Sequence, residues 1–272
     1  MPRLIVNGDD FGAAPAVNAA IAEAFRTGIL TSASLMVTGE AVDEAVALAR
    51  ELPGLRVGLH LVLLSGRSCL PPEEVPHLVD TQGCFPENPL AAGVRWMFSA
   101  AARRELRREV EAQVTRFQET GLPPDHLNSH RHFHVHPLVF DLLVEAADRL
   151  GRPHIRFPAE SWRLALAADR RYARQQIGYA LVFGLLAAAY RRRRRVVSPG
   201  VDGVFGLLRT GTIDETYLIR LLQRLPEGCF ELYLHPRLDT MQGRRELAAL
   251  CSTRVRQVIA ERRIVLTTYG DR

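Results

Sequence analysis

The sequence predicts a single α/β domain, built on a parallel sheet or a (β/α) barrel. Short apolar stretches typical of buried strands alternate with longer stretches of helical periodicity along nearly the whole chain. The length of 272 residues fits one such domain, and a hydrophobic content of 47% supplies a large core. Polar residues that can carry chemistry fall near the ends of several expected strands. These are the places where parallel α/β folds position their sites.

The expected elements follow one another in a regular order. Strands are expected at 3–7, 31–37, 56–63, 126–130, 154–157, 229–235 and 263–268. Helices are expected at 17–25, 41–51, 100–120, 138–150, 170–195, 213–224 and 243–262. Pro15 suits the first turn of the first helix, where the missing amide hydrogen is not needed. Because helices separate the strands, we expect the strands to be parallel, with their carboxyl ends on one face.

Two segments interrupt this alternation within the domain of residues 1–272. Residues 65–95 are rich in proline and glycine and are expected to form a long loop, of the kind that serves as a lid or binding element. Residues 170–197 are expected to form an apolar-basic helical insert. Its apolar run at 177–190 leads into five arginines, Arg191–Arg195, and is too short to span a bilayer. The insert is either a buried helix with a charged end or an interfacial helix that pairs with anionic lipids.

Charge and cysteine content exclude several classes of protein. The net charge of +5 comes from the five-arginine run, and the rest of the chain is nearly balanced, which argues against nucleic-acid binding. The four cysteines are scattered without a CxxC pair, so neither a disulfide framework nor a zinc knuckle is expected. The first residues lack the apolar stretch of a signal peptide. We therefore expect a cytoplasmic protein, peripheral at the membrane if the insert is interfacial.

Asp9 and Asp10 are adjacent acids at the end of the first expected strand. Gly8 and Gly12 frame them and permit a tight backbone path that points both carboxylates inward. Aspartate and glycine are equally typical of an ordinary exposed turn, so this pair alone leaves both interpretations open. The same holds for His60, which lies in the apolar stretch GLHLVLL, where a lone histidine is more often structural than a ligand.

A histidine cluster carries a sharper signal. Five histidines occupy residues 126–136, at positions 126, 130, 132, 134 and 136. On a strand the last four would point to one side, and on a helix His130 and His134 would share a face. Either geometry can present imidazoles to a divalent metal. We expect at least one of them to be a ligand or a catalytic group, and others to orient their neighbours.

His235 ends the expected strand CFELYLH, where a general acid would be well placed. Together these groups suggest a reaction. One aspartate and two histidines would bind a metal that activates water and polarises a carbonyl oxygen. The other aspartate would take the proton of the water, and a histidine would protonate a leaving amine. This chemistry is amide hydrolysis.

The four motifs NGDDFG, GLHL, HLNSHRHFH and LYLHP resemble, in order and spacing, those of the YdjC-like carbohydrate deacetylases. The resemblance covers nearly the whole chain. It implies an irregular (β/α) barrel of the glycoside hydrolase/deacetylase type that removes acetyl groups from N-acetylated sugars. It also implies Asp9 as the base, His235 as the acid, and a Mg²⁺ or Zn²⁺ ion held by Asp10, His60 and His130. Two histidine ligands suit zinc chemically.

One position departs from the resemblance. The family commonly has aspartate where this chain has Asn128, and we expect an indirect effect through neighbouring residues rather than loss of activity. The roles of His132, His134 and His136 stay open.

The chain is similar to the branch of this family that is associated with hopanoid biosynthesis. That similarity implies an N-acetylglucosamine-type sugar on a hopanoid glycolipid, with residues 177–195 touching the inner membrane face. Family members often form homodimers. The alternatives are a deacetylase of soluble chito-oligosaccharides and a non-catalytic sugar- or lipid-binding barrel. A metal-dependent phosphoester hydrolase is a further alternative, but no glycine-rich phosphate loop supports it.

Overall fold

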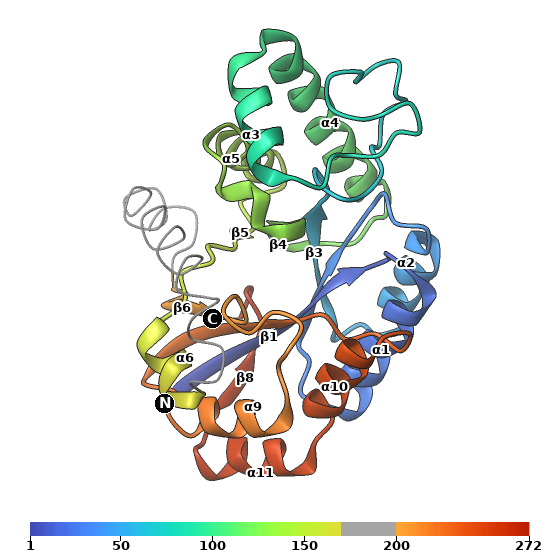
Figure 1. The fold of residues 1–272 in the computed structure, drawn as a ribbon. Helices are drawn as coiled ribbons and strands as arrows, with labels where there is room; N and C mark the ends of the chain where they lie inside the picture. Colours follow the sequence, from blue (N-terminus) through green and yellow to red (C-terminus); the bar gives the residue numbers. More distant parts are fainter. Residues whose placement is uncertain (170–199, 272) are drawn as a thin grey trace.

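The computed structural model describes residues 1–169 and 200–271, and it confirms the α/β class (Figure 1). Within these ranges the strands form one sheet in which every strand pairing is parallel. The strands are β1 (Pro2–Phe11), β2 (Ser32–Leu35), β3 (Arg56–Leu61), β4 (Pro124–Ser129), β5 (His154–Ile155), β6 (Gly203–Phe205), β7 (Gly228–Leu234) and β8 (Val265–Thr267).

The sheet has the order β5-β4-β3-β2-β1-β7-β6, with β8 paired to β1. Strand β1 is long enough for three partners. One edge of β1 pairs with β7 from Pro2 to Gly8. The other edge pairs with β8 from Arg3 to Ile5 and with β2 from Asn7 onward. The sheet curls into a half-barrel whose described end strands are β5 and β6, in agreement with the predicted irregular barrel.

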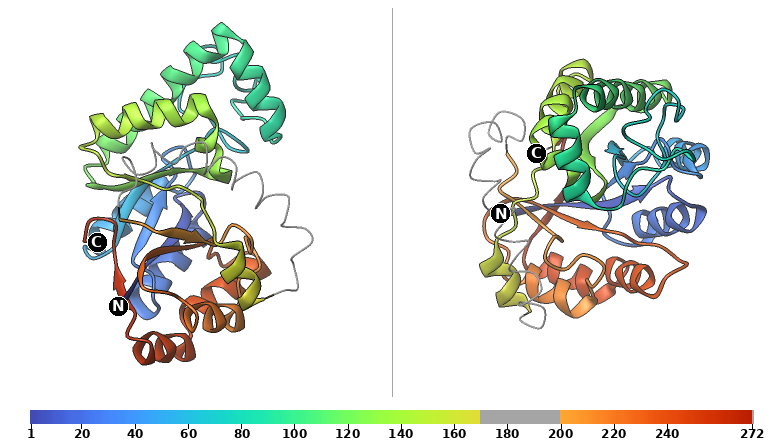
Figure 2. Two further views of the ribbon diagram at one scale, coloured as in Figure 1. Left: turned by 90° about the vertical axis from the view of Figure 1, so that its left-hand side faces the viewer. Right: turned by 45° about the horizontal axis from the view of Figure 1, so that its top comes forward.

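Helices lie around the curled sheet, with α4 and α5 at the top of the view in Figure 1 and α9 to α11 at the bottom; Figure 2 shows the same two groups from other directions. Helix α4 shows why they form. Leu106, Val110, Val114 and Phe117 recur at helical spacing and are almost fully buried, while arginines and glutamates occupy most of the outer face. Burying each such side chain stabilises the fold by about 1.5–3 kcal/mol.

The described helices are α1 (Pro15–Thr27), α2 (Val42–Glu51), α3 (Pro89–Phe98), α4 (Ala100–Glu119), α5 (Pro137–Arg149), α6 (Trp162–Ala168), α9 (Glu215–Leu222), α10 (Met241–Leu250) and α11 (Thr253–Glu261), with a 3-10 helix η1 (His130–Val135).

Three expectations about elements were wrong in detail. The loop expected at 65–95 ends earlier, because Asn88 caps helix α3 and Pro89 fills its first turn. The single helix expected at 243–262 is two helices, since Ser252 caps α11 by accepting from the amides of Arg254 and Val255. The short elements β6 and α6 were not expected. Each has too few residues to show a clear period.

The remaining part of the 65–95 segment lies against α4. Glu109 of α4 accepts hydrogen bonds from the backbone amides of Cys69 and Leu70, and Glu105 accepts from the amide of His77. The insert expected at 170–197 lies outside the described residues. Among the helices of residues 1–169 and 200–271, none is long and apolar enough to cross a bilayer.

Candidate active site

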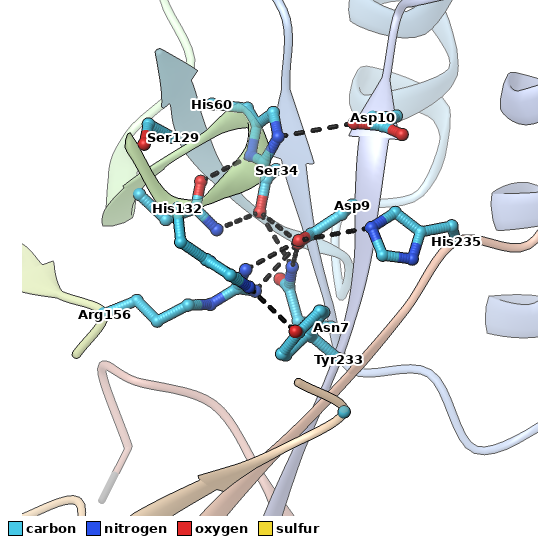
Figure 3. A network of polar contacts seen from close by, with 12 residues as sticks. Asn7, Asp9, Asp10, Ser34, His60, Ser129, His132, Arg156, Tyr233 and His235 are labelled. Carbon is cyan, nitrogen blue, oxygen red and sulfur yellow. Dashed lines mark hydrogen bonds and ion pairs between the residues drawn. The ribbon is translucent and has the colours of Figure 1, made fainter. Parts of the chain in front are cut away.

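The carboxyl ends of four strands bring the predicted site residues together, and Figure 3 shows Asp9, Asp10, His60 and His235 among them. Asp9 and Asp10 lie on β1 and His60 on β3, while His130 follows β4 and His235 follows β7. Asp9 is at the centre of the polar network, with Arg156 and His235 approaching it from different sides. The residues gathered from separate parts of the sequence therefore face one another across the concave side of the sheet.

Strand β1 continues through Phe11 rather than ending in the expected turn at Gly8. The register between β1 and β2 shifts between Gly8 and Phe11, and Asp10 has a φ of 67°. This left-handed conformation is costly for a residue with a Cβ, by about 1–3 kcal/mol, and is typical of functional sites. Successive side chains of a regular strand point to opposite faces. The irregularity instead lets Asp9 and Asp10 both reach the site.

Asp9 is buried and paired with Arg156. The guanidinium donates to both carboxylate oxygens, at 2.6 and 2.8 Å, and its Nε donates to Glu231 at 2.5 Å. Burial alone would raise the pKa of Asp9, but the charge and hydrogen bonds of Arg156, with smaller contributions from His60 and His235, hold this pKa well below its ordinary value. Asp9 is therefore an ionised, oriented carboxylate.

Two further groups fix the Asp9 carboxylate. Asn7 Nδ2 donates to Asp9 Oδ1 at 2.7 Å, and Ser34 Oγ donates to the same oxygen at 3.2 Å. Ser34 is itself surrounded by polar groups, since it also accepts from Asn7 Nδ2 at 2.7 Å and contacts His126 Nε2 at 3.0 Å. On the open side of Asp9, His235 Nε2 lies 4.0 Å from Oδ2.

Asp10 and His60 present a converging pair of donor atoms. Asp10 Oδ1 lies 3.3 Å from His60 Nε2, and the two buried atoms make no hydrogen bond. Unsatisfied buried polar atoms are costly and suggest an absent partner such as a cation. His130 donates through Nδ1 to the carbonyl of Leu64 at 3.0 Å, and its ring centroid lies 6.0 Å from that of His60. Within the described ranges, no group of three or more histidine, cysteine or acidic residues is arranged to hold a metal ion without rearrangement.

The pKa shifts of these groups are compatible with metal binding by Asp10 and His130 and with acid catalysis by His235. Burial raises the pKa of Asp10, but His60, His235 and His130 outweigh it and lower the value to about 2. Burial lowers the pKa of His130, which favours the neutral imidazole that metals bind. Burial would also lower the pKa of His235, but the carboxylates of Asp10, Asp9 and Glu246 raise it overall. His235 keeps 28% side-chain exposure, so an acid is available to a substrate.

His126 lies on strand β4, as expected, but the last four histidines of the cluster form neither the strand nor the α-helix considered from the sequence. Residues His130–Val135 form η1, interrupted by left-handed backbone at Arg131 and His132, with φ of 56° and 55°. His130 therefore stands next to Asp10 and His60 while its neighbours turn away. Arg131 donates to Ser65 Oγ and to the carbonyl of Glu87, which joins the 65–95 segment to the site.

The other histidines of this segment support the site from behind. His132 Nε2 contacts the hydroxyl of Tyr233 at 2.7 Å. His134 lies between Ser129 Oγ and the carbonyl of Arg156, at 2.8 Å from each, and burial lowers its pKa to about 3. A neutral His134 can thus position Arg156. This agrees with the expectation that some histidines orient their neighbours.

Comparison with known proteins now identifies the family. The model of the YdjC-like protein family matches residues 3–261. The chain belongs to this family. A chitooligosaccharide deacetylase from Enterobacter sp. (strain 638) is 31% identical over 286 residues, covering 98% of each chain. A carbohydrate deacetylase from Geobacillus stearothermophilus is 44% identical over 154 residues, a match that spans 56% of this chain and 59% of that protein.

A solved structure has the same fold as this YdjC-like chain. It is a putative cellobiose-phosphate cleavage protein from Enterococcus faecalis V583, with a TM-score of 0.77 and 26% identity, covering 99% of this chain and 98% of that one. The family motifs and the shared fold agree. In the structure of this chain, the four motifs lie at one end of one curled sheet.

The sequence did not reveal the groups that hold Asp9. Arg156 and Glu231 sit singly in short apolar strands, HIRF and CFELYL, and Ser34 sits in a strand with no other signal. A lone arginine or glutamate in an apolar strand is rarely buried without a partner of opposite charge. That pairing rule is the one signal that could have connected Arg156 and Glu231 beforehand.

Proposed function

We propose that this YdjC-like chain is a metal-dependent N-deacetylase that acts on an N-acetylglucosamine-type sugar. The observation that carries the proposal is the ionised Asp9, held by Arg156 between the Asp10–His60 pair and His235. Relatives named as carbohydrate and chitooligosaccharide deacetylases support the same activity.

Asp10, His60 and His130 would hold a divalent ion, Mg²⁺ or Zn²⁺, and the one-carboxylate, two-imidazole donor set suits Zn²⁺. When bound, the ion would polarise the acetyl carbonyl and acidify a water. Asp9 would accept a proton as the water oxygen bonds to the acetyl carbon; a carboxylate with so low a pKa is a weak base, so this role needs a water of lowered pKa. His235, whose pKa is raised, would donate a proton to the amide nitrogen as the C–N bond breaks, which leaves acetate and a free amine.

Acetate release tests the activity. The purified chain, with Zn²⁺ or Mg²⁺, should release acetate from N-acetylglucosamine oligomers, and chelation should abolish the release. Asp9→Asn should lower kcat by at least about 100-fold, the order expected for loss of a general base. Asp148→Asn, an exposed residue of α5 paired to Arg152, serves as the matched control and should leave kcat unchanged. Release that survives Asp9→Asn would reject the assigned base. No release from any acetylated sugar would favour a non-catalytic binding barrel.

For the natural substrate we propose an N-acetylated sugar on a hopanoid glycolipid, with residues 177–195 making peripheral contact with the inner membrane face. The apolar run followed by five arginines supports it. Deleting 177–195 should lower activity on a lipid-borne sugar more than on a soluble one, and equal losses would reject this. Soluble chito-oligosaccharides are the second candidate, favoured by the Enterobacter relative. We also propose a homodimer, to be measured by sedimentation velocity.

A further inference from the structure

Helix α3 packs tightly against the site through one face only. Trp96 is fully buried and meets the ring of Phe133 edge-on at a centroid distance of 5.3 Å. Gly93 approaches η1 so closely that a Cβ there would lie 3.0 Å from the ring of His136. The inner face of α3 therefore contacts the segment that follows His130 along the chain.

The outer face of α3 is apolar as well, and nothing in the described parts of the chain covers it. Leu90, Val94 and Phe98 follow one another at intervals of four residues and are 80%, 61% and 80% exposed, with Met97 beside them at 37%. We call these four residues the α3 stripe. Four large apolar side chains on one surface helix exceed the scattered single exposures that are normal for a globular protein, and such patches mark interaction sites.

The exposed charges next to the α3 stripe along the chain are mostly positive. From Glu87 to Arg104 they are one acid, Glu87, and three arginines, Arg95, Arg103 and Arg104. The next acidic residue along the chain, Glu105, is buried against His77 and does not neutralise them. An apolar helix face bordered by arginines suits a surface that is apolar inside and anionic at its edge.

We propose that the α3 stripe docks on an anionic lipid bilayer. Leu90, Val94 and Phe98 would enter the headgroup boundary, while the arginines pair with lipid phosphates. A second copy of this chain is the less suitable occupant. A two-fold contact through the same stripe would bring about six arginines but only two glutamates to one interface, where the excess of like charges repels.

Docking through α3 would also place the site at the membrane. Because α3 supports η1 directly, a bilayer in contact with its outer face would lie beside the segment that carries His130. The α3 stripe contains none of residues 177–195. The docking stands independently of the proposed deacetylation, because vesicle binding is measured without any substrate.

Vesicle co-sedimentation of the full chain tests the proposal. Vesicles of phosphatidylcholine alone are compared with vesicles that also contain phosphatidylglycerol. Leu90→Ser with Phe98→Ser should lower partition onto the anionic vesicles at least about tenfold, because two large apolar contacts are lost. Met241→Ser removes a side chain that is 81% exposed on α10, and this matched control should not change partition. Arg103→Gln with Arg104→Gln should reduce binding to anionic vesicles by about tenfold or more and leave binding to neutral vesicles unchanged.

Several outcomes would overturn the proposal. One is that the wild-type chain does not bind anionic vesicles. Another is that the Leu90/Phe98 variant binds them as well as the Met241 control does. Circular dichroism spectra and acetate release from a soluble sugar show whether each variant is folded. If the same apolar variant turns a dimer into a monomer in sedimentation velocity while vesicle binding persists, the stripe is a contact between copies of this chain.

Discussion

Asn128 shows how one amide can set the protonation of His60, a proposed metal ligand. With Oδ1 toward His60 Nδ1, at 2.6 Å, the histidine must carry its proton on Nδ1, and Nε2 is left as a lone pair facing Asp10. Turned by 180°, the amide would instead donate to His60 Nδ1 and accept from Arg156 at 3.0 Å. His60 would then be protonated at Nε2, which a cation cannot use. An amide permits both arrangements, whereas a carboxylate would enforce the first.

We therefore predict that Asn128→Asp tightens metal binding. The carboxylate would accept from His60 Nδ1–H in every conformation and fix the ligand tautomer, which is worth on the order of tenfold in affinity. Titration calorimetry with Zn²⁺ measures the change. Asn88→Asp, at the exposed cap of α3, is the control for the added negative charge. An affinity that stays equal or falls for Asn128→Asp would contradict this account of His60.

Ser34 is expected to position the base without touching substrate. Removing its hydroxyl deletes one hydrogen bond to Asp9 and leaves an amide hydrogen of Asn7 with one acceptor fewer. Ser34→Ala should lower kcat by about tenfold with little change in KM, and cost about 1–3 kcal/mol of stability. Ser32→Ala is the matched control, because Ser32 is equally buried on β2 but donates to the carbonyl of Arg56. Similar kcat losses in both variants would show that Ser34 acts only on stability.

At the scale of elements, hydrophobic periodicity predicted most strands and helices because their buried faces dominate the sequence pattern. It also placed the candidate residues at or near strand ends, which is where the structure has them. Two local features escaped it. The continuation of β1 through Asp10 and the left-handed kink at Arg131 and His132 both require backbone that residues with a Cβ disfavour. Tertiary contacts impose these conformations, such as the bonds from Arg131 to Ser65 and Glu87. The backbone preferences of the residues themselves do not predict these conformations.

Helix α4 acts as a support for the 65–95 segment, and Glu109 is its main polar contact. The carboxylate accepts from the amides of Cys69 and Leu70 and from Gln113. Burial raises the pKa of Glu109 more than these hydrogen bonds lower it. Leu64, the residue directly before the segment, accepts a hydrogen bond from His130 through its carbonyl, so the start of the segment lies next to the site.

Glu109→Ala should loosen this segment. Two backbone amides would lose their acceptor, which lowers stability by about 2 kcal/mol and Tm by roughly 5 °C for a chain of this size. Differential scanning fluorimetry measures the shift, and limited trypsin digestion should cut sooner after the exposed Arg67. Glu111→Ala, an exposed change on the same helix, should alter neither. A Tm unchanged by Glu109→Ala would show that the segment is held by apolar packing instead.

Across the whole molecule, Arg156 links strands that the sheet order keeps apart. It follows β5, at one end of the sheet, and reaches Asp9 on β1 and Glu231 on β7. The half-barrel thus gains a polar bridge across its concave side, and the same bridge sets the charge of the base. Burying three charges is tolerable only while they remain paired, so stability and activity depend on one side chain.

We predict that Arg156→Met destabilises the fold by about 3–5 kcal/mol, because it leaves two carboxylates buried without a cation, and lowers Tm by roughly 10 °C. Adding Asp9→Asn and Glu231→Gln to this variant should recover part of the lost stability.

The pH dependence of the stability follows from the lowered pKa of Asp9. A carboxylate with a depressed folded-state pKa contributes stability that is present above its ordinary value of 3.8 and is lost as the pH falls through the folded-state value. Without Arg156, burial would raise the pKa of Asp9. Protonation of Asp9 at low pH would then remove a buried unpaired charge and stabilise the Arg156→Met variant. The Tm gap between wild type and Arg156→Met should therefore be widest at neutral pH and narrow below about pH 5. A gap that is constant from pH 4 to 8 would mean that the arginine stabilises the half-barrel by packing over Tyr233, 4.6 Å from the ring centroid, rather than by its charge.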